Sequence, residues 1–265
     1  MSRTTGPAVA AWIGADVVTR AEVATEVDRL RAGPFGARLP PDDGSAAARQ
    51  FRRWVAQRVV LRRLLDAELA AFGPPADAGP PATPDPALLG AAAADVLATS
   101  AAARAVFAAV TADVRVAEQE VRDYYARNPD RFRRSARWTL RHAFHPTDPE
   151  PLAGRLPTAP PVVAAPDSLP AAVAAAARAA GHPPVTAGPV RSPLGWHLVA
   201  LDAEHPPTVV PYPQARAQIA AHLLDRARQR AFARWLDARC ATLVRLTPGY
   251  EHPADPCHPD ATHRH

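Results

Sequence analysis

The chain has 265 residues, 48% of them hydrophobic, and a formal net charge of +5, and its basic residues are all arginines spread along the whole length. This scatter favours solvated helix faces over a nucleic-acid-binding surface, and no apolar run reaches the roughly 18 residues that a membrane span needs. We therefore expect a folded protein with a buried core, and with neither nucleic acid nor membrane as its partner.

The N-terminal part predicts a short sheet followed by helices. Residues 9–23 have the pattern of strand, turn, strand and helix start, with Thr19 as the N-cap and Glu22 at the spacing of a capping box. Residues 46–72 predict a long helix with one apolar face. That face is formed by Trp54, Leu61, Leu65, Leu69 and Phe72. The Ala-rich residues 87–110 predict a further helix.

The middle of the chain changes from helical to strand periodicity. Residues 118–127 predict a helix that Asn128-Pro129 closes. Apolar or aromatic residues and His142 then alternate with Thr139, Arg141 and Ala143, which is typical of a half-buried strand. The alternating residues are Trp138, Leu140, His142 and Phe144. The remaining expected elements are a loop over 145–167, a helix over 169–180, a strand over 198–201 and a last helix over 214–243.

Two segments carry a more specific signal. Residues 116–144 end in the strand Trp-Thr-Leu-Arg-His142-Ala-Phe, and residues 188–201 read Gly-Pro-Val-Arg-Ser192-Pro-Leu-Gly-Trp-His197-Leu-Val-Ala-Leu. Together they resemble the opening and closing segments of the parvulins, the peptidyl-prolyl cis–trans isomerases that turn X-Pro bonds. The order of N-terminal helices, rotamase segment and closing helix is similar to that of the parvulin foldases, in which both chain ends build one chaperone lobe.

The resemblance implies an α+β fold, with a mostly helical lobe from both termini and a small parvulin-like domain inserted into it. The expected segments are an N-terminal lobe over 1–115, a shortened parvulin-like domain over 116–206, a C-terminal helix over 207–246 that packs on the lobe, and a tail over 247–265 rich in proline, histidine and cysteine.

The resemblance also implies the site residues. His142 and His197 match the paired histidines of the family, which lie side by side on neighbouring strands, and Ser192 matches a position where the family often has Ser or Thr. The Gly-Asp-Leu-Gly-aromatic loop of the family has no counterpart here. Asp148 and Asp167 are substitutes for its acid that no positional argument favours.

Two further features bear on whether the site is active. The segment that supplies the proline slot of the family offers only Leu169, Ala172 and Val173, and only 54 residues separate the two histidines. The structural alternative is a pair of imidazoles that satisfy each other as ordinary core groups. An active isomerase and an inactive scaffold both stay open.

The tail holds a second group of chemically capable residues. Imidazole and thiolate are ligands of zinc and nickel. The candidate ligands are His252, Cys257, His258, His263 and His265. Their spacing is not that of a zinc finger, and the alternative is a solvated tail that binds nothing in particular.

These observations lead to one main hypothesis and two alternatives. The main hypothesis is a peptidyl-prolyl isomerase or foldase that needs no cofactor and acts on unfolded or partly folded clients with X-Pro segments. The alternatives are an inactive parvulin-fold maturation chaperone for one partner, which could itself be a metalloenzyme, with Zn or Ni at the tail, and a general holdase. Two cysteines and no recognisable signal peptide predict a cytoplasmic location.

Overall fold

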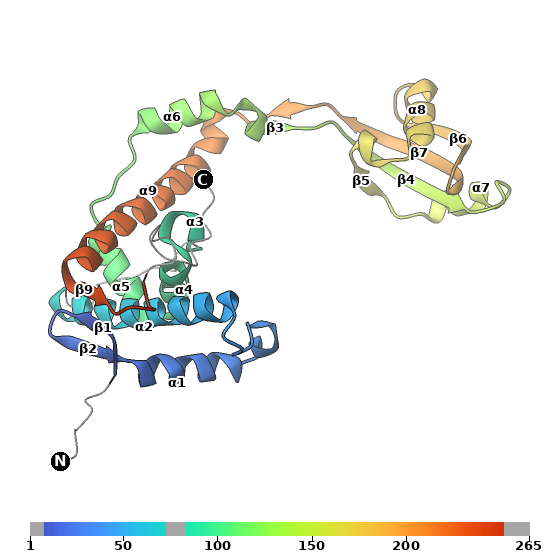
Figure 1. Cartoon of the computed structure of the whole chain (residues 1–265). Coiled ribbons are helices and arrows are strands. Elements are labelled where there is room, and N and C mark those ends of the chain that lie inside the picture. Colours follow the sequence, from blue (N-terminus) through green and yellow to red (C-terminus); the bar gives the residue numbers. More distant parts are fainter. Residues whose placement is uncertain (1–7, 73–82, 252–265) are drawn as a thin grey trace, which may run out of the picture. The chain divides into compact units, whose positions relative to one another are not determined.

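The computed structural model describes residues 8–72 and 83–251, and the chain divides into two compact units. The helical unit combines residues 1–116 with 221–265, and the sheet unit comprises residues 117–220 (Figure 1). Helix and strand segregate along the chain in the α+β manner, which confirms the fold class expected from the sequence.

The second boundary between the two units falls inside the long helix α9 (Tyr212–Leu243), after Ala220. The start of α9 is held by α6 (Glu118–Arg127), because the Tyr212 hydroxyl and the Arg216 guanidinium both bind Glu118, at 2.5 and 2.7 Å. Arg216 first, and then Tyr212, lower the pKa of Glu118 to about 2, so this contact is ionised at neutral pH.

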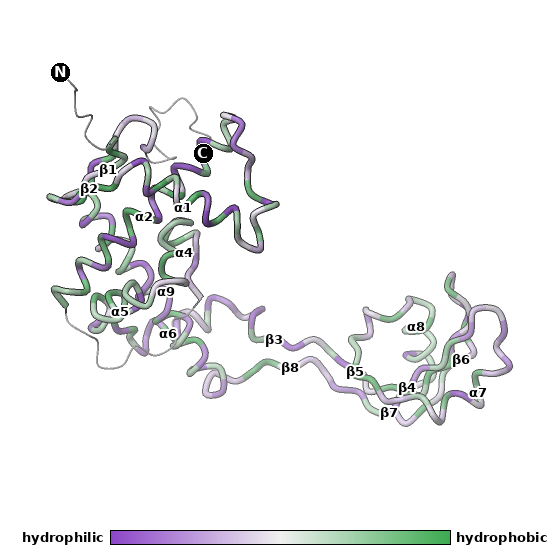
Figure 2. The backbone as a smooth tube through the Cα atoms, turned by 90° about the horizontal axis from the view of Figure 1, so that it is seen from below, coloured by the Kyte–Doolittle hydropathy of each residue, from purple (hydrophilic) through white to green (hydrophobic). Residues whose placement is uncertain are grey.

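The helical unit begins with two strands and then runs through helices of very different length. Its elements are β1 (Val9–Ile13), β2 (Asp16–Thr19), α1 (Arg20–Arg31), a 3₁₀ turn (Gly36–Arg38), α2 (Ala46–Phe72), α3 (Pro86–Leu89), α4 (Ala91–Thr99), α5 (Ala101–Val110), the main part of α9 and β9 (Val244–Leu246). Hydrophobic and hydrophilic residues alternate along α1 and α2 in Figure 2, as expected for helices with one buried face.

A three-stranded sheet of order β2-β1-β9 joins the two ends of the described chain. Ala11 pairs with Leu246 in antiparallel register, and the Thr247 hydroxyl donates to the carbonyl of Ala10 at 3.0 Å. The capping box predicted at Thr19 and Glu22 is present at the start of α1, where it satisfies helical N–H groups that would otherwise lack a partner.

The Ala-rich segment expected as one helix is broken twice. Gly90 lies between α3 and α4 with φ +79°, and Ser100 separates α4 from α5 and caps α5 by accepting from the Ala103 N–H. The single-helix prediction was wrong because alanine favours helix on both sides of a break and so hides it.

The sheet unit contains α6 and a four-stranded antiparallel sheet with short helices around it. After α6 and a 3₁₀ turn (Pro129–Phe132) come β3 (Arg133–Arg134), β4 (Arg137–His145), α7 (Leu152–Arg155), a 3₁₀ turn (Leu156–Thr158), β5 (Val162–Ala164), a 3₁₀ turn (Pro166–Ser168), α8 (Ala171–Ala180), β6 (Val185–Ser192), β7 (Gly195–His205) and β8 (Thr208–Val209). The order of the large sheet is β5-β4-β7-β6, and β3 pairs with β8 separately.

The large sheet buries apolar side chains on both faces. On one face Leu140 and Leu201 pack against Val173 of α8, and on the other Ala143 and Leu198 pack against Leu152 of α7. The face covered by α8 also carries His142 and His197, because cross-strand partners share a face and these residues continue the same alternation.

In the described residues no single helix is both long and apolar enough to cross a membrane. Helices α4 and α5 meet the length and composition criteria only when taken together, and they are bent by 107° at their junction.

Candidate functional site

The register of β4 and β7 brings the two histidines together. Phe144 lies opposite His197 and His142 lies opposite Val199, so the imidazoles are diagonal neighbours on one sheet face. Nε2 of His142 lies 2.9 Å from Nδ1 of His197, and the two rings stack with centroids 5.1 Å apart. The prediction that residues more than fifty positions apart lie side by side is confirmed.

Ser192 extends this pair into a hydrogen-bonded line of three side chains. Its Oγ lies 2.7 Å from Nε2 of His197 and accepts the Leu194 N–H at 3.0 Å. Ser192 and His197 are buried and His142 is half-buried, so solvent reaches the line mainly at its His142 end. We call these residues, His142, His197 and Ser192, the imidazole line.

The imidazole line is mostly uncharged at neutral pH. Burial, and then the neighbouring His197, lower the pKa of His142 below its ordinary value, and burial lowers the pKa of His197. Each neutral ring has one N–H and one lone pair. The hydrogen bonds can therefore run from Ser192 through His197 to His142 or in the reverse direction. Either direction gives a partner to both nitrogens of His197 and to Nε2 of His142.

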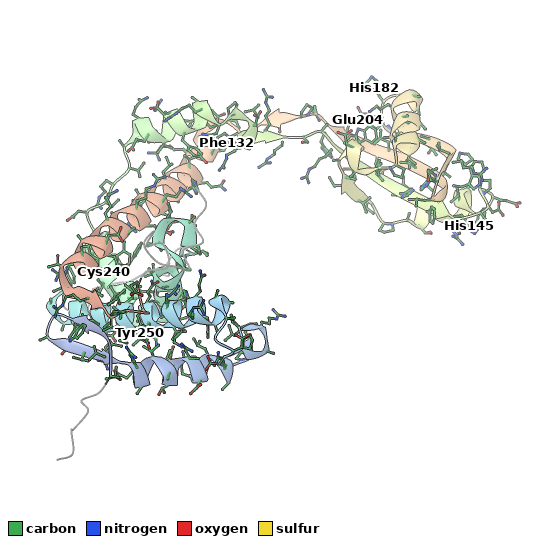
Figure 3. All side chains as sticks on the ribbon, in the orientation of Figure 1. Phe132, His145, His182, Glu204, Cys240 and Tyr250 are labelled. Carbon is green, nitrogen blue, oxygen red and sulfur yellow. The ribbon has the colours of Figure 1, made fainter. Side chains whose placement is uncertain are left out.

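Two glycines allow the backbone around this line to approach closely. Gly195 has φ +140°, and a Cβ at this position would lie 2.6 Å from the carbonyl oxygen of His145. Gly188 has φ +113°, and a Cβ there would lie 2.7 Å from the carbonyl oxygen of His197. Both positions thus need glycine, for sterics and for backbone conformation. His145 marks this end of β4 in Figure 3.

An exposed apolar surface lies beside the imidazole line. Phe144 is 41% exposed although its ring centroid is 5.1 Å from that of His197. Leu194, in the turn that follows Ser192, is 68% exposed. The sequence pattern missed this surface, because the alternation in β4 predicts an inward Phe144. The sequence signal for an exposed Phe144 was its position at the end of the strand, directly before His145-Pro146.

The proposed substitutes for the missing acid lie elsewhere. The Asp148 carboxylate accepts the Glu150 N–H within a turn, and Asp167 forms an ion pair with Arg178 and is 96% exposed. Within residues 8–72 and 83–251, no carboxylate or thiol is hydrogen-bonded to either imidazole.

The expected slot residues are divided between core and surface. Val173 is buried in the core under α8, Leu169 packs partly against the same core, and Ala172 is exposed. Of these three residues, Leu169 and Val173 therefore add to the apolar packing on this face of the sheet, and Ala172 does not.

The five candidate metal ligands, His252, Cys257, His258, His263 and His265, lie outside the described residues. Inside the described ranges, no group of three or more His, Cys, Asp or Glu side chains is arranged to hold a metal ion. The metal-binding tail stays a prediction.

One protein-family model matches the chain, a family of unknown function (DUF7158), over residues 9–45. No curated protein matches it. Similar solved structures include a chain from work on PEB4 and Cj1289, SurA-like chaperones of Campylobacter jejuni, at 13% identity, covering 89% of this chain and 98% of that one with a TM-score of 0.45. PrsA, a peptidylprolyl isomerase of Bacillus anthracis, is 12% identical. The match covers 85% of this chain and 89% of that one, with a TM-score of 0.25. At these values the neighbours assign no function to this chain.

Proposed function

We propose that this protein is a peptidyl-prolyl cis–trans isomerase that acts on X-Pro segments of unfolded or partly folded clients. The observation that carries the proposal is the buried, uncharged imidazole line next to the exposed Phe144. The parvulin-like sequence of residues 116–144 and 188–201 supports the same assignment.

The chemistry asked of such a site is modest. Rotation about a peptide bond crosses a barrier of about 18–20 kcal/mol that comes from amide resonance, and it needs no covalent step. Resonance is lost in the twisted amide, so that its charge separation is smaller than in the planar amide. A surface that excludes water and adds no charge therefore favours the twisted form.

The residues of the site divide these tasks. Phe144 offers apolar surface to the client residues around the bond. The neutral imidazoles place polar but uncharged groups beside it, and Ser192 holds His197 in orientation from the buried side. Because hydrogen bonds join the three side chains to one another, the geometry of the line does not depend on a bound client.

A protease-free isomerisation assay on Ala-Xaa-Pro-Phe peptides tests the proposal. We expect the native chain to accelerate isomerisation above the buffer rate, and His197→Phe to return the rate towards buffer. His182→Gln is the matched control, since this histidine belongs to the same unit and is 99% exposed. A native rate equal to that of buffer would reject the isomerase.

A second candidate is a non-catalytic chaperone of the same fold that matures one partner, with Zn or Ni bound at the tail. It is favoured by the absence, in the described residues, of a carboxylate or thiol bonded to either imidazole. Calorimetric titration with Ni²⁺ or Zn²⁺ should then release more heat from the full chain than from one that ends at Glu251. Equal heats from the two chains would reject metal binding by the tail. A cytoplasmic location stays a prediction in both cases.

A further inference from the structure

The helical unit contains a partly open cavity of about 460 Å³ that is separate from the imidazole line. Its walls come from α2, from the junction of α3 and α4, and from the end of α9 with β9. The apolar wall residues are Val60, Leu61, Leu89, Leu236, Val244 and Leu246. Cavities that bind small ligands have this size and this mainly apolar lining.

The charged residues of the cavity are all acidic. Asp237 and Glu251 line it, and among the described residues no arginine does, although the chain as a whole has a net charge of +5. Asp237 is exposed on the last part of α9, and its field acts on the neighbouring Cys240 thiol. The local charge is therefore opposite to that of the whole protein.

Cys240 lines the same cavity and lies on the C-terminal part of α9 in Figure 3. Burial first, and then the negative charge of Asp237, raise the pKa of its thiol to about 11. The group is thus a neutral, weakly polar thiol at pH 7, which suits non-covalent contact with an apolar ligand better than nucleophilic attack.

Gln57 adds an unused hydrogen-bond donor. Its Nε2 atom is buried and has no hydrogen-bond partner within the described residues, and Gln57 is one of the cavity walls. A buried donor without an acceptor is costly, so a ligand that brings a carbonyl oxygen would gain from meeting it. Peptide backbone supplies such oxygens.

We propose that this cavity is a second client site, which binds a short extended segment in which one Lys or Arg is flanked by aliphatic residues. The aliphatic side chains contact Leu61 and Leu236, a backbone carbonyl accepts from Gln57, and the cation lies near Asp237. The site needs no proline and no imidazole, so it can serve the protein whether or not the sheet unit is an isomerase.

Fluorescence anisotropy on the full chain tests this with three labelled peptides that contain no proline. The first has the core Leu-Val-Arg-Leu-Val, the second has Glu in place of Arg, and the third keeps Arg but has Ser at the aliphatic positions. We expect the first to bind roughly fivefold or more tighter than either of the others at low salt. Salt should reduce the preference for Arg over Glu.

The matched variants are Asp237→Asn at the cavity and Asp28→Asn, which removes the same charge from an exposed position on α1. Only Asp237→Asn should lower the preference for Arg, about threefold. In a Cys257→Ser background the first peptide should also slow alkylation of Cys240. His197→Phe should leave peptide binding unchanged, so this test is independent of isomerase activity.

Three results would overturn the proposal. One is equal affinity for the Arg and Glu peptides, and another is an equal effect of the two Asp variants. The third is binding that appears only in a chain that ends at Glu251, because the cavity would then belong to the chain's own tail.

Discussion

The molecule has two buried polar clusters that offset the free-energy cost of desolvation in different ways, one through ion pairs and the other through neutral hydrogen bonds. In the helical unit, Arg58 is 4% exposed and its guanidinium meets Asp95 at 2.6 Å and Glu26 at 3.3 Å. The same guanidinium lies 5.0 Å above the ring of Trp54. In the sheet unit the imidazole line is neutral, and hydrogen bonds between its members satisfy both nitrogens of His197 and Nε2 of His142.

The difference shows that burial of a polar side chain does not by itself mark a functional site. The Arg58 cluster joins α1, α2 and α4, and its charges are matched by partners within the unit. The imidazole line joins adjacent strands and lies next to Phe144, an apolar side chain that its own core leaves exposed. An unused apolar surface beside a neutral polar line is the feature that sets the second cluster apart.

The largest expected effect comes from breaking the ionic cluster. Arg58→Met keeps the apolar stem but leaves Asp95 without its cation and Glu26 with Arg29 alone, which should cost about 3 kcal/mol of unfolding free energy. Denaturant unfolding of the helical unit, followed peptide by peptide by hydrogen exchange, measures this loss. Isomerisation of small peptides at 10 °C should not change, because the imidazole line is untouched.

The control for this variant is Arg63→Met. Arg63 also pairs with a carboxylate of α1, Glu22, but its side chain is 44% exposed. The expected loss is below about 1 kcal/mol, because exposed ion pairs are screened by water. Equal losses from both variants would show that burial does not distinguish these two ion pairs.

The second effect tests the backbone that shapes the imidazole line. Gly195→Ala places a Cβ against the His145 carbonyl at φ +140°, and it should destabilise the sheet unit by about 2 kcal/mol. Gly181→Ala is matched in conformation, with φ +100°, but its Cβ would meet open space. Hydrogen exchange in β6 and β7 should increase more for Gly195→Ala. A larger effect of Gly181→Ala would contradict the close approach seen here.

Local signals in the sequence predicted much of this architecture. Thr19 and Glu22 identified the start of α1, and the alternation through Trp138 and Leu140 identified β4, because both patterns involve residues close in sequence. Strand β6 was missed, since it contains Gly188 and Pro189, which lower strand propensity. An edge strand tolerates them because half of its N–H groups need no ladder partner.

The same contrast between local and long-range signals applies to the two polar clusters. The His142–His197 contact could be expected only from the resemblance to a family, since 54 residues separate the two positions. The Arg58 cluster gave no such clue, because Glu26 and Asp95 lie on helices whose crossing is set by packing of the core. Contacts between distant segments depend on tertiary packing, which residue patterns within one segment do not encode.

A smaller effect is expected at the buried end of the imidazole line. Ser192→Ala removes the partner of Nε2 of His197 and the acceptor of the Leu194 N–H, which should cost the sheet unit about 1–2 kcal/mol. Ser192→Thr keeps the hydroxyl and should restore both stability and any isomerase rate. If alanine and threonine behave alike in both measurements, Ser192 does not position His197.

The smallest effect is the contribution of imidazole titration to the free energy of unfolding. It is negligible at neutral pH and grows on acidification. The folded pKa values of His142 and His197 lie below 6.5, the ordinary value to which unfolding returns them. The unfolded chain therefore takes up protons at a higher pH than the folded chain, and the free energy of unfolding falls as the pH drops below about 6.5. Hydrogen exchange in β4 and β7 at pH 7.5 and 5.5, corrected for the intrinsic exchange rate, should show this loss. It should shrink in the double variant His142→Phe/His197→Phe. An equal loss in native and variant chains would mean that other groups titrate, and the contrast between a charged cluster and a neutral line would then lose its pH signature.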